Sequence, residues 1–200
     1  MAHRLVFGVG NNDIPGASKL THKDPFYVAW AGMLKRCYSD KYLEKYPSYK
    51  GCSVVDEWLS FSAFKAWMLT QDWQGMVLDK DLAVAGNRVY GPDTCLFIPE
   101  WLNTLLSSLT PLRRDLPMGV SRKKGRYRAR YSRQCKAVNL GHFDTPEDAH
   151  VAYRAFRVAE IRSWLDLYQA KAQPSLKVVA ALQRLHEREE IYVAQLLSAA

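Results

Sequence analysis

The 200-residue sequence has no acidic residue between Gly119 and Phe143, and it lacks several features that would define a class of protein. No stretch approaches the roughly 18 to 20 consecutive apolar residues that a membrane-spanning helix needs. The residues after Met1 contain no apolar core of the length found in a secretory signal. We therefore expect a cytoplasmic protein with no membrane partner.

Cysteine is scarce, and its spacing does not suggest a metal site. The chain has four cysteines, at Cys37, Cys52, Cys95 and Cys135. They are widely separated and form no Cys-x-x-Cys pair, the spacing that most zinc sites use. The pattern predicts reduced, buried thiols.

Positive charge is present in excess, and it is concentrated. The chain has 28 Lys and Arg residues against 20 Asp and Glu residues, and eight of the basic ones lie in the acid-free segment. Those eight are Arg122, Lys123, Lys124, Arg126, Arg128, Arg130, Arg133 and Lys136. Without them the chain has 20 residues of each sign, so the net charge of +8 belongs to one segment. Such a segment marks a place for a polyanion; the alternative is a solvated face that only maintains solubility.

The basic segment has the periodicity of a β-strand. Residues 126–131 read Arg-Tyr-Arg-Ala-Arg-Tyr, which places three arginines on one face of a strand and Tyr-Ala-Tyr on the other. Lys124-Gly125 is typical of a tight turn, and Gly119-Val120 and residues 138–141 are expected to form flanking strands. The sequence therefore predicts a three-stranded antiparallel sheet with an arginine face, which suits the major groove of DNA.

Helices are predicted on the C-terminal side of this sheet. Thr145 is a good N-cap and Pro146 suits the first helical position. One side of the helix should pack on the sheet through Ala149, Ala152, Tyr153 and Phe156, while His150 and His186 are expected to face solvent. Pro174 ends that helix, and a last amphipathic helix follows with apolar positions at Val178, Leu182 and Leu185.

The first half of the chain is aromatic-rich and mixes helices with short strands. Asp24-Pro25 and Ser60 predict helix starts, residues 76–81 predict a strand ending in charges, and a short helix should begin near Pro99. The prolines at 111 and 117 predict a linker. The expected class is α+β, with a first domain at 1–110, a linker at 111–117, a sheet domain at 118–172 and a C-terminal helix at 173–200.

Several motifs resemble the Apetala-two or ethylene-response-factor DNA-binding domain. They are Gly119-Val120-Ser121-Arg122, Gly125-Arg126-Tyr127-Arg128-Ala129, the run from Asn139 to Ala149, and Ala152-Tyr153. The resemblance implies a sheet lying in the major groove, supported by one helix, with groove-facing positions at Arg122, Lys124, Arg126, Arg128 and Arg130. We expect Arg126, Arg128 and Arg130 to read base edges of double-stranded DNA. Phosphates would be contacted by Arg122, Lys123, Lys124, Arg133 and Lys136.

The first half is similar to phage HNH-type homing endonucleases. The similarity runs from Trp30 to Tyr38 through Tyr46-Pro47-Ser48-Tyr49, Trp58-Leu59 and Phe61. It continues from Leu78 through Gly86-Asn87 and Tyr90-Gly91-Pro92 to Asn103. It implies a ββα-metal fold in which Asp79 and Asn103 bind Mg²⁺ and the catalytic group is Asp79, Lys80, Asp81 and Asn103. Lys80 stands where active members have the general-base histidine, Thr94 replaces the central asparagine, and the chain has no histidine between His22 and His142. The alternative is a solvated strand end or a structural salt-bridge cluster.

Three functions follow from the sequence. The leading hypothesis is a double-stranded DNA-binding protein of the phage homing-endonuclease type, acting in the host cell cytoplasm, whose HNH-like site is degenerate. The alternative is an active, metal-dependent DNA-nicking or DNA-cleaving endonuclease. The third is an interaction protein that binds a host factor, or a second copy of itself, through the last helix.

Overall fold

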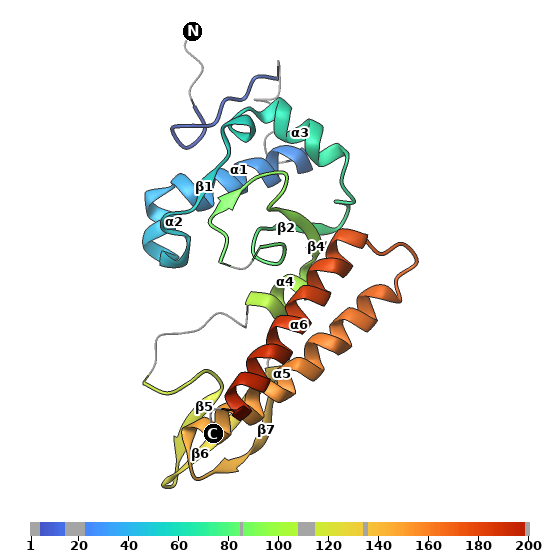
Figure 1. The fold of residues 1–200 in the computed structure, drawn as a ribbon. Coiled ribbons are helices and arrows are strands. Elements are labelled where there is room, and N and C mark those ends of the chain that lie inside the picture. The colour runs from blue at the N-terminus through green and yellow to red at the C-terminus, as the bar shows by residue number, and fades with distance from the viewer. Residues whose placement is uncertain (1–4, 15–22, 85, 108–114, 134–135, 199–200) are drawn as a thin grey trace. The chain divides into compact units, whose positions relative to one another are not determined.

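The structure is a computed structural model that describes residues 5–14, 23–84, 86–107, 115–133 and 136–198. The chain is α+β and divides into two compact units, Met1–Glu100 and Trp101–Ala200 (Figure 1). Most of the expected linker at 111–117 lies outside the described residues. No helix in the described ranges combines the length and apolar character needed to cross a membrane.

The first unit combines helices with two small sheets. Its elements are α1 (Pro25–Tyr38), α2 (Asp40–Lys45), η2 (Pro47–Tyr49), β1 (Ser53–Val54), η3 (Asp56–Leu59), α3 (Phe61–Leu69), β2 (Met76–Asp79), β3 (Val89–Tyr90) and β4 (Leu96–Pro99). β1 pairs with β3 in parallel, and β2 pairs with β4 in antiparallel orientation. Helix α4 (Glu100–Ser107) begins at the last residue of this unit.

The predicted helix starts of the first unit are confirmed. The Asp24 carboxylate accepts a hydrogen bond from the Phe26 backbone N–H at 2.9 Å, and the Ser60 hydroxyl accepts one from Ala63 N–H at 3.3 Å. Each side chain satisfies an N–H group that has no partner within its helix. The two caps fix where α1 and α3 begin.

Aromatic side chains fill the core of the first unit. Trp30, Trp58, Phe61 and Phe64 are fully buried, and the Trp30 indole donates to the Trp58 carbonyl at 2.8 Å. The three cysteines in the described ranges are buried free thiols, as predicted; Cys135 lies outside those ranges. Burial raises the pKa of Cys37 to about 12 and that of Cys95 to about 11, which makes both poor nucleophiles.

The second unit contains the predicted three-stranded antiparallel sheet. Its strands are β5 (Val120–Lys123), β6 (Arg126–Arg133) and β7 (Lys136–Phe143), with β6 in the centre. The sheet packs on α5 (Pro146–Gln169), which is followed by α6 (Leu176–Ser198) (Figure 1). Thr145 caps α5 by accepting a hydrogen bond from Asp148 N–H at 3.1 Å, as predicted.

Helices α5 and α6 pack against each other. This packing involves the apolar stripe of the last helix, which was expected to bind a host factor or a second copy of the chain. Val178, Leu182 and Leu185 are all buried. The stripe on which the interaction hypothesis relied is therefore not an uncovered surface in this structure.

Candidate nucleic-acid interface

The β5–β6 turn sets the register of the basic sheet. Lys124 and Gly125 have φ values of 50° and 80°, which is the left-handed pair of a two-residue type I′ hairpin turn. Because the loop has two residues, Lys123 pairs with Arg126, and Ser121 then pairs with Arg128. Directly paired residues share a face of the sheet, so this turn decides which basic side chains lie together.

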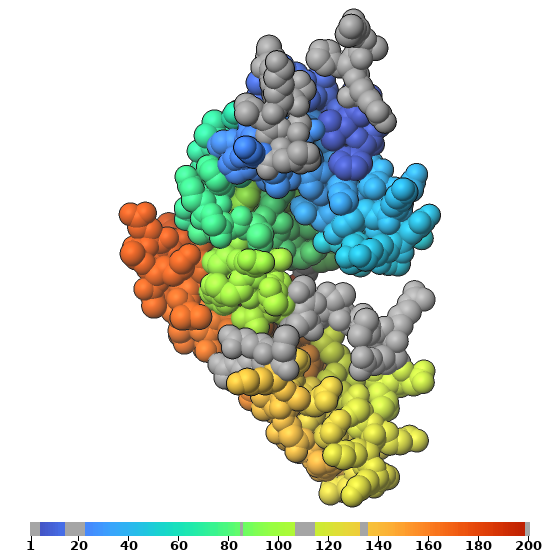
Figure 2. All heavy atoms as spheres, turned by 180° about the vertical axis from the view of Figure 1, so that it is seen from behind, coloured from blue at the N-terminus to red at the C-terminus, as the bar shows by residue number. Residues whose placement is uncertain are grey.

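One face of the sheet is basic and open. It carries Lys123, Arg126, Arg128 and Arg130, with His142 paired to Arg128 and Asn139 paired to Arg130. All of these side chains are exposed except Arg128, which is half-buried. In Figure 2 the side chains of β5 and β6, in yellow-green and yellow, project from the surface. No residue of the three strands is acidic, so we call these side chains the arginine face.

The register removes Arg122 from that face. Arg122 pairs with Tyr127, on the side that packs towards α5. Its guanidinium donates to the Tyr127 hydroxyl at 2.9 Å and lies 5.3 Å from the centre of that ring. The expectation that Arg122 faces the same groove as Arg126 is therefore corrected. The hairpin turn is the signal that could have found this, because it fixes the pairing of every residue in β5.

The remaining basic positions lie at the ends of the strands. Lys124 is exposed at the tip of the hairpin. Lys136 is exposed and pairs with Arg133, at register positions on the same side as Tyr131. The side chain of Arg133 is outside what the structure describes. By register, neither Lys124 nor Lys136 belongs to the arginine face.

A β-bulge in β7 shapes the covered side of the sheet. Ala129 pairs with Gly141 but Arg130 pairs with Asn139, so Leu140 is the extra residue. Leu140 packs against the small core of Val120, Ala129 and Ala149. The bulge therefore turns an apolar residue inward and keeps Asn139 on the arginine face.

The arginines on the open face keep most of their hydrogen-bonding capacity. Arg126 pairs with Asp144 at 2.8 Å, but both side chains are largely exposed, and such pairs are weak. Arg128 is held by one long bond of 3.4 Å to Ser121, and its Nε has no partner among the described residues. Lys123, Lys124, Arg126 and His142 line a shallow depression beside the turn. The face can offer several donors to an anionic ligand.

A buried polar chain supports the sheet from behind. Arg154 donates to His150 Nε2 at 3.3 Å, so Nδ1 carries the proton and donates to the Met118 carbonyl at 2.9 Å. Arg154 and Arg157 also pair with the two carboxylate oxygens of Glu189, at 2.9 and 3.2 Å. These bonds connect α6, α5 and the residues that lead into β5.

This network corrects one sequence expectation. His150 is buried and does not face solvent, and burial lowers its pKa. Burial also lowers the pKa of Arg157, and Glu189 opposes that shift. Arg157 and Glu189 were missed because charged residues at helical spacing normally indicate a solvent-exposed face.

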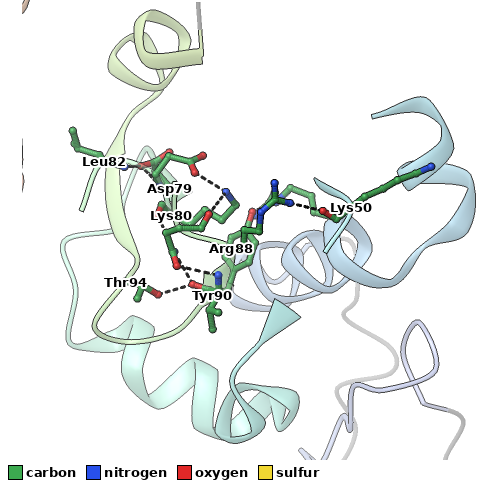
Figure 3. A network of polar contacts seen from close by, with 11 residues as sticks. Lys50, Asp79, Lys80, Leu82, Arg88, Tyr90 and Thr94 are labelled. Carbon is green, nitrogen blue, oxygen red and sulfur yellow. Dashed lines mark hydrogen bonds and ion pairs between the residues drawn. The ribbon is translucent and has the colours of Figure 1, made fainter. Parts of the chain in front are cut away.

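In the first unit, the charged residues at the end of β2 are bonded within the protein and do not form an open face. Asp79 is buried, and its Oδ1 accepts backbone N–H groups from Asp81 at 3.1 Å and Leu82 at 2.8 Å (Figure 3). Burial raises the pKa of Asp79, and the Leu82 N–H acts in the opposite direction. The carboxylate thus closes the turn that follows β2.

Lys80 is also buried and forms two contacts as a donor. Its Nζ donates to Asp81 at 2.6 Å and to the Asn87 carbonyl at 3.0 Å. A general base must accept a proton, whereas an ammonium group with these partners only donates. Asn87, which the HNH resemblance includes without a site role, completes the loop by donating to the Lys80 and Val89 carbonyls.

The other residues implied by the HNH resemblance lie further along the chain. Asn103 lies in α4, within Trp101–Ala200, whereas Asp79 belongs to Met1–Glu100. Thr94 donates to the Val89 carbonyl at 2.7 Å. Among the described residues, no group of three or more His, Cys, Asp and Glu side chains could hold a metal ion.

No protein-family model, curated protein or solved structure matches the chain.

Proposed function

We propose that this protein binds double-stranded DNA by placing the arginine face of the β5–β6–β7 sheet in the major groove. The observation that supports it best is the arginine face itself, where the described side chains of Arg126, Arg128 and Arg130 share one side of a rigid sheet that has no carboxylate. A surface that needed only solubility would normally mix the two signs of charge.

The dimensions of the sheet suit this ligand. Strands lie about 4.8 Å apart, so the three backbones span about 10 Å, and the major groove is about 12 Å wide. Sheets and two-stranded ribbons are known readers of that groove. The buried network behind the sheet supports the proposal further, because it ties the start of β5 to two long helices and holds the face in one shape.

The basic residues divide into two roles by their place on the sheet. Arg128 and Arg130 lie in the central strand, where a guanidinium can form two hydrogen bonds with guanine. Lys123, Lys124 and Arg126, the first residue of β6, surround the hairpin turn, which suits contacts with phosphates. We therefore assign Arg126 to the phosphate contacts and not, as the sequence suggested, to the base contacts. His142 lines the same depression. In this arrangement the turn positions the protein and the central strand reads the bases.

A salt titration tests the proposal. If six to ten phosphates are contacted, affinity for a labelled duplex should fall by about 10³ to 10⁵ between 50 and 200 mM salt. A nearly flat dependence on salt would contradict DNA binding by a cationic face.

Arg128→Ala tests the base-reading role. A duplex first selected from a random pool should lose about 1 to 3 kcal/mol of binding free energy, and a random duplex should lose less. Arg122→Ala is the matched control, because it removes the same charge from the opposite side of the same hairpin. Equal losses on both duplexes would make Arg128 a phosphate contact.

A further inference from the structure

A second group of cations lies in the first unit, around the short helix α2. Residues 35–50 contain five Lys or Arg residues and only two acidic ones, although residues 1–100 as a whole contain eleven of each sign. Four of these five cations are exposed. Arg88, the residue before β3, is exposed as well. We call these exposed residues the α2 patch: Lys35, Lys41, Lys45, Lys50 and Arg88.

The cations of the α2 patch have no carboxylate partners. Within the described ranges, none of the five forms an ion pair. Other lysines of the same unit do: Lys65 pairs with Asp24 at 3.8 Å and Lys80 with Asp81 at 2.6 Å. Lys23, outside the patch, also forms no ion pair in the described ranges, so what distinguishes the patch is that five exposed, unpaired cations come from neighbouring segments.

Tyrosine rings support the lysines. The Lys35 ammonium lies 5.5 Å from the centre of the Tyr42 ring, and that of Lys45 lies 5.4 Å from the centre of the Tyr46 ring. The Tyr42 ring is 4.5 Å from Tyr46 and 5.8 Å from Tyr49. A ring beneath an ammonium attracts it and limits its motion, so the rings hold the two charges in place on one continuous surface.

A backbone contact joins the two halves of the patch. The Arg88 guanidinium donates to the Lys50 carbonyl at 2.5 Å (Figure 3). This bond holds the residue before β3 against the end of η2. On α2 itself, Lys41 and Lys45 lie one turn apart on one side of the helix, and Asp40 and Glu44 lie one turn apart on another. Glu44 lies three residues after Lys41 and so beside it on the helix, but neither Glu44 nor Asp40 forms an ion pair with these lysines in the described ranges.

We infer that the α2 patch binds the phosphate backbone of DNA, as a second contact besides the arginine face. This inference rests on the proposed function, which brings a duplex to the protein. DNA offers one negative charge per about 1.7 Å of helix axis, so a row of unpaired cations can engage several phosphates. Lysine acts on phosphate as a point charge, so the patch adds affinity without sequence preference.

The experiment uses the full-length chain and a fluorescein-labelled, random-sequence duplex of 30 base pairs. Lys45→Ala/Lys50→Ala removes two charges from the patch, and Lys23→Ala/Lys65→Ala removes two from elsewhere in the same unit. Two lost phosphate contacts should reduce the slope of log affinity against log salt by about 1.8, with the control unchanged. Arg88 is left intact because of its bond to the Lys50 carbonyl. Circular dichroism should show that both variants stay folded, since the altered side chains are exposed or half-buried.

Three outcomes separate the inference from the proposed function. If the patch variant and its control have the same salt slope as the original protein, the inference fails, while loss of binding by Arg128→Ala would still support the arginine face. If the patch variant weakens binding and sheet variants do not, the proposed function fails and the patch stands. If the patch variant loses binding to polyglutamate but not to DNA, the patch is a site for an acidic polypeptide and the inference is overturned.

Discussion

The second unit has arginines in two regions, exposed on the sheet and buried on α5, and the two regions differ in how far carboxylates balance the arginine charges. Among the described residues, Arg126, Arg128 and Arg130 on the open side of the sheet have one exposed carboxylate partner between them, Asp144. On α5, Arg154 and Arg157 pair with both oxygens of the buried Glu189. The residue type is the same, but the charges of one set are balanced inside the protein by a buried carboxylate, whereas those of the other set are largely not.

This difference separates structural charge from charge available to a ligand. A buried cation paired with a buried carboxylate stabilises one arrangement of helices and is not accessible to a partner. An exposed cation on a rigid sheet keeps its donors for an incoming anion. The first unit repeats the contrast, since Lys80 is buried and bonded to Asp81 and Asn87, whereas Lys45 and Lys50 are exposed without ion pairs among the described residues.

The largest effect is expected from removing the buried carboxylate. Glu189→Gln leaves Arg154 and Arg157 without their common counter-charge, and breaking a buried ion pair in this way costs about 3 to 5 kcal/mol. Urea denaturation followed by tryptophan fluorescence measures the free energy of unfolding. Glu190→Gln is the control, because Glu190 is the next residue and is more than half exposed. A loss below about 1 kcal/mol at Glu189 would mean that the network does not hold the helices together.

A smaller loss is expected at Asp79. Asp79→Ala removes the acceptor of the buried Leu82 N–H and of the part-buried Asp81 N–H in the turn after β2, and the unmet buried group costs about 1 to 3 kcal/mol. Asp79→Asn keeps the accepting oxygen and should restore most of the stability. DNA affinity should be unchanged in both variants.

The same variants test the alternative role of Asp79 in a nuclease. In the structural role, supercoiled plasmid incubated with Mg²⁺ or Mn²⁺ stays intact. Metal-dependent nicking that both Asp79→Ala and Asp79→Asn abolish would contradict that role and support the HNH-type alternative. Plasmids carrying duplexes selected by the protein should be included, so that a missing target site does not hide the activity.

Sequence patterns predicted the sheet and the helix starts because their determinants are local. The alternation of residues 126–131, the Lys124-Gly125 turn and the caps at Asp24, Ser60 and Thr145 each act within a few residues. The bulge at Leu140 was not predicted, because it depends on how β7 packs over Val120 and Ala129.

The charged network escaped prediction for a different reason. Glu189 pairs with Arg154 and Arg157, and Arg154 in turn contacts His150. These α5 residues lie 32 to 39 positions before Glu189 in the sequence, and no local pattern marks partners so far apart. The same holds for Asp79, where sequence similarity pointed to a metal but the nearest donors are two backbone N–H groups. Whether a charge is satisfied is a tertiary property.

A modest gain in DNA affinity is expected when the arginine face loses Asp144, the carboxylate that pairs with Arg126. Asp144→Asn frees Arg126 and removes a negative charge beside the sheet, so binding should tighten several-fold at 50 mM salt, with a stability change under about 1 kcal/mol. Asp166→Asn is the matched control, because Asp166 forms a similar exposed pair with Arg162 at 3.0 Å on α5. Tightening in both variants would indicate a general effect of net charge.

The smallest effect is a dependence of stability on pH through His150. Its pKa is lowered in the folded protein, first by burial, and its neighbours include the cationic Arg154 and Arg157 and the anionic Glu189. The unfolded chain therefore binds the proton more readily, so His150 contributes stability above about pH 6.5 that is lost as the pH falls. Unfolding free energies between pH 8 and pH 5 should decline for the original protein and decline less for His150→Gln. A curve for His150→Gln that declines as steeply as that of the original protein would contradict the role of His150.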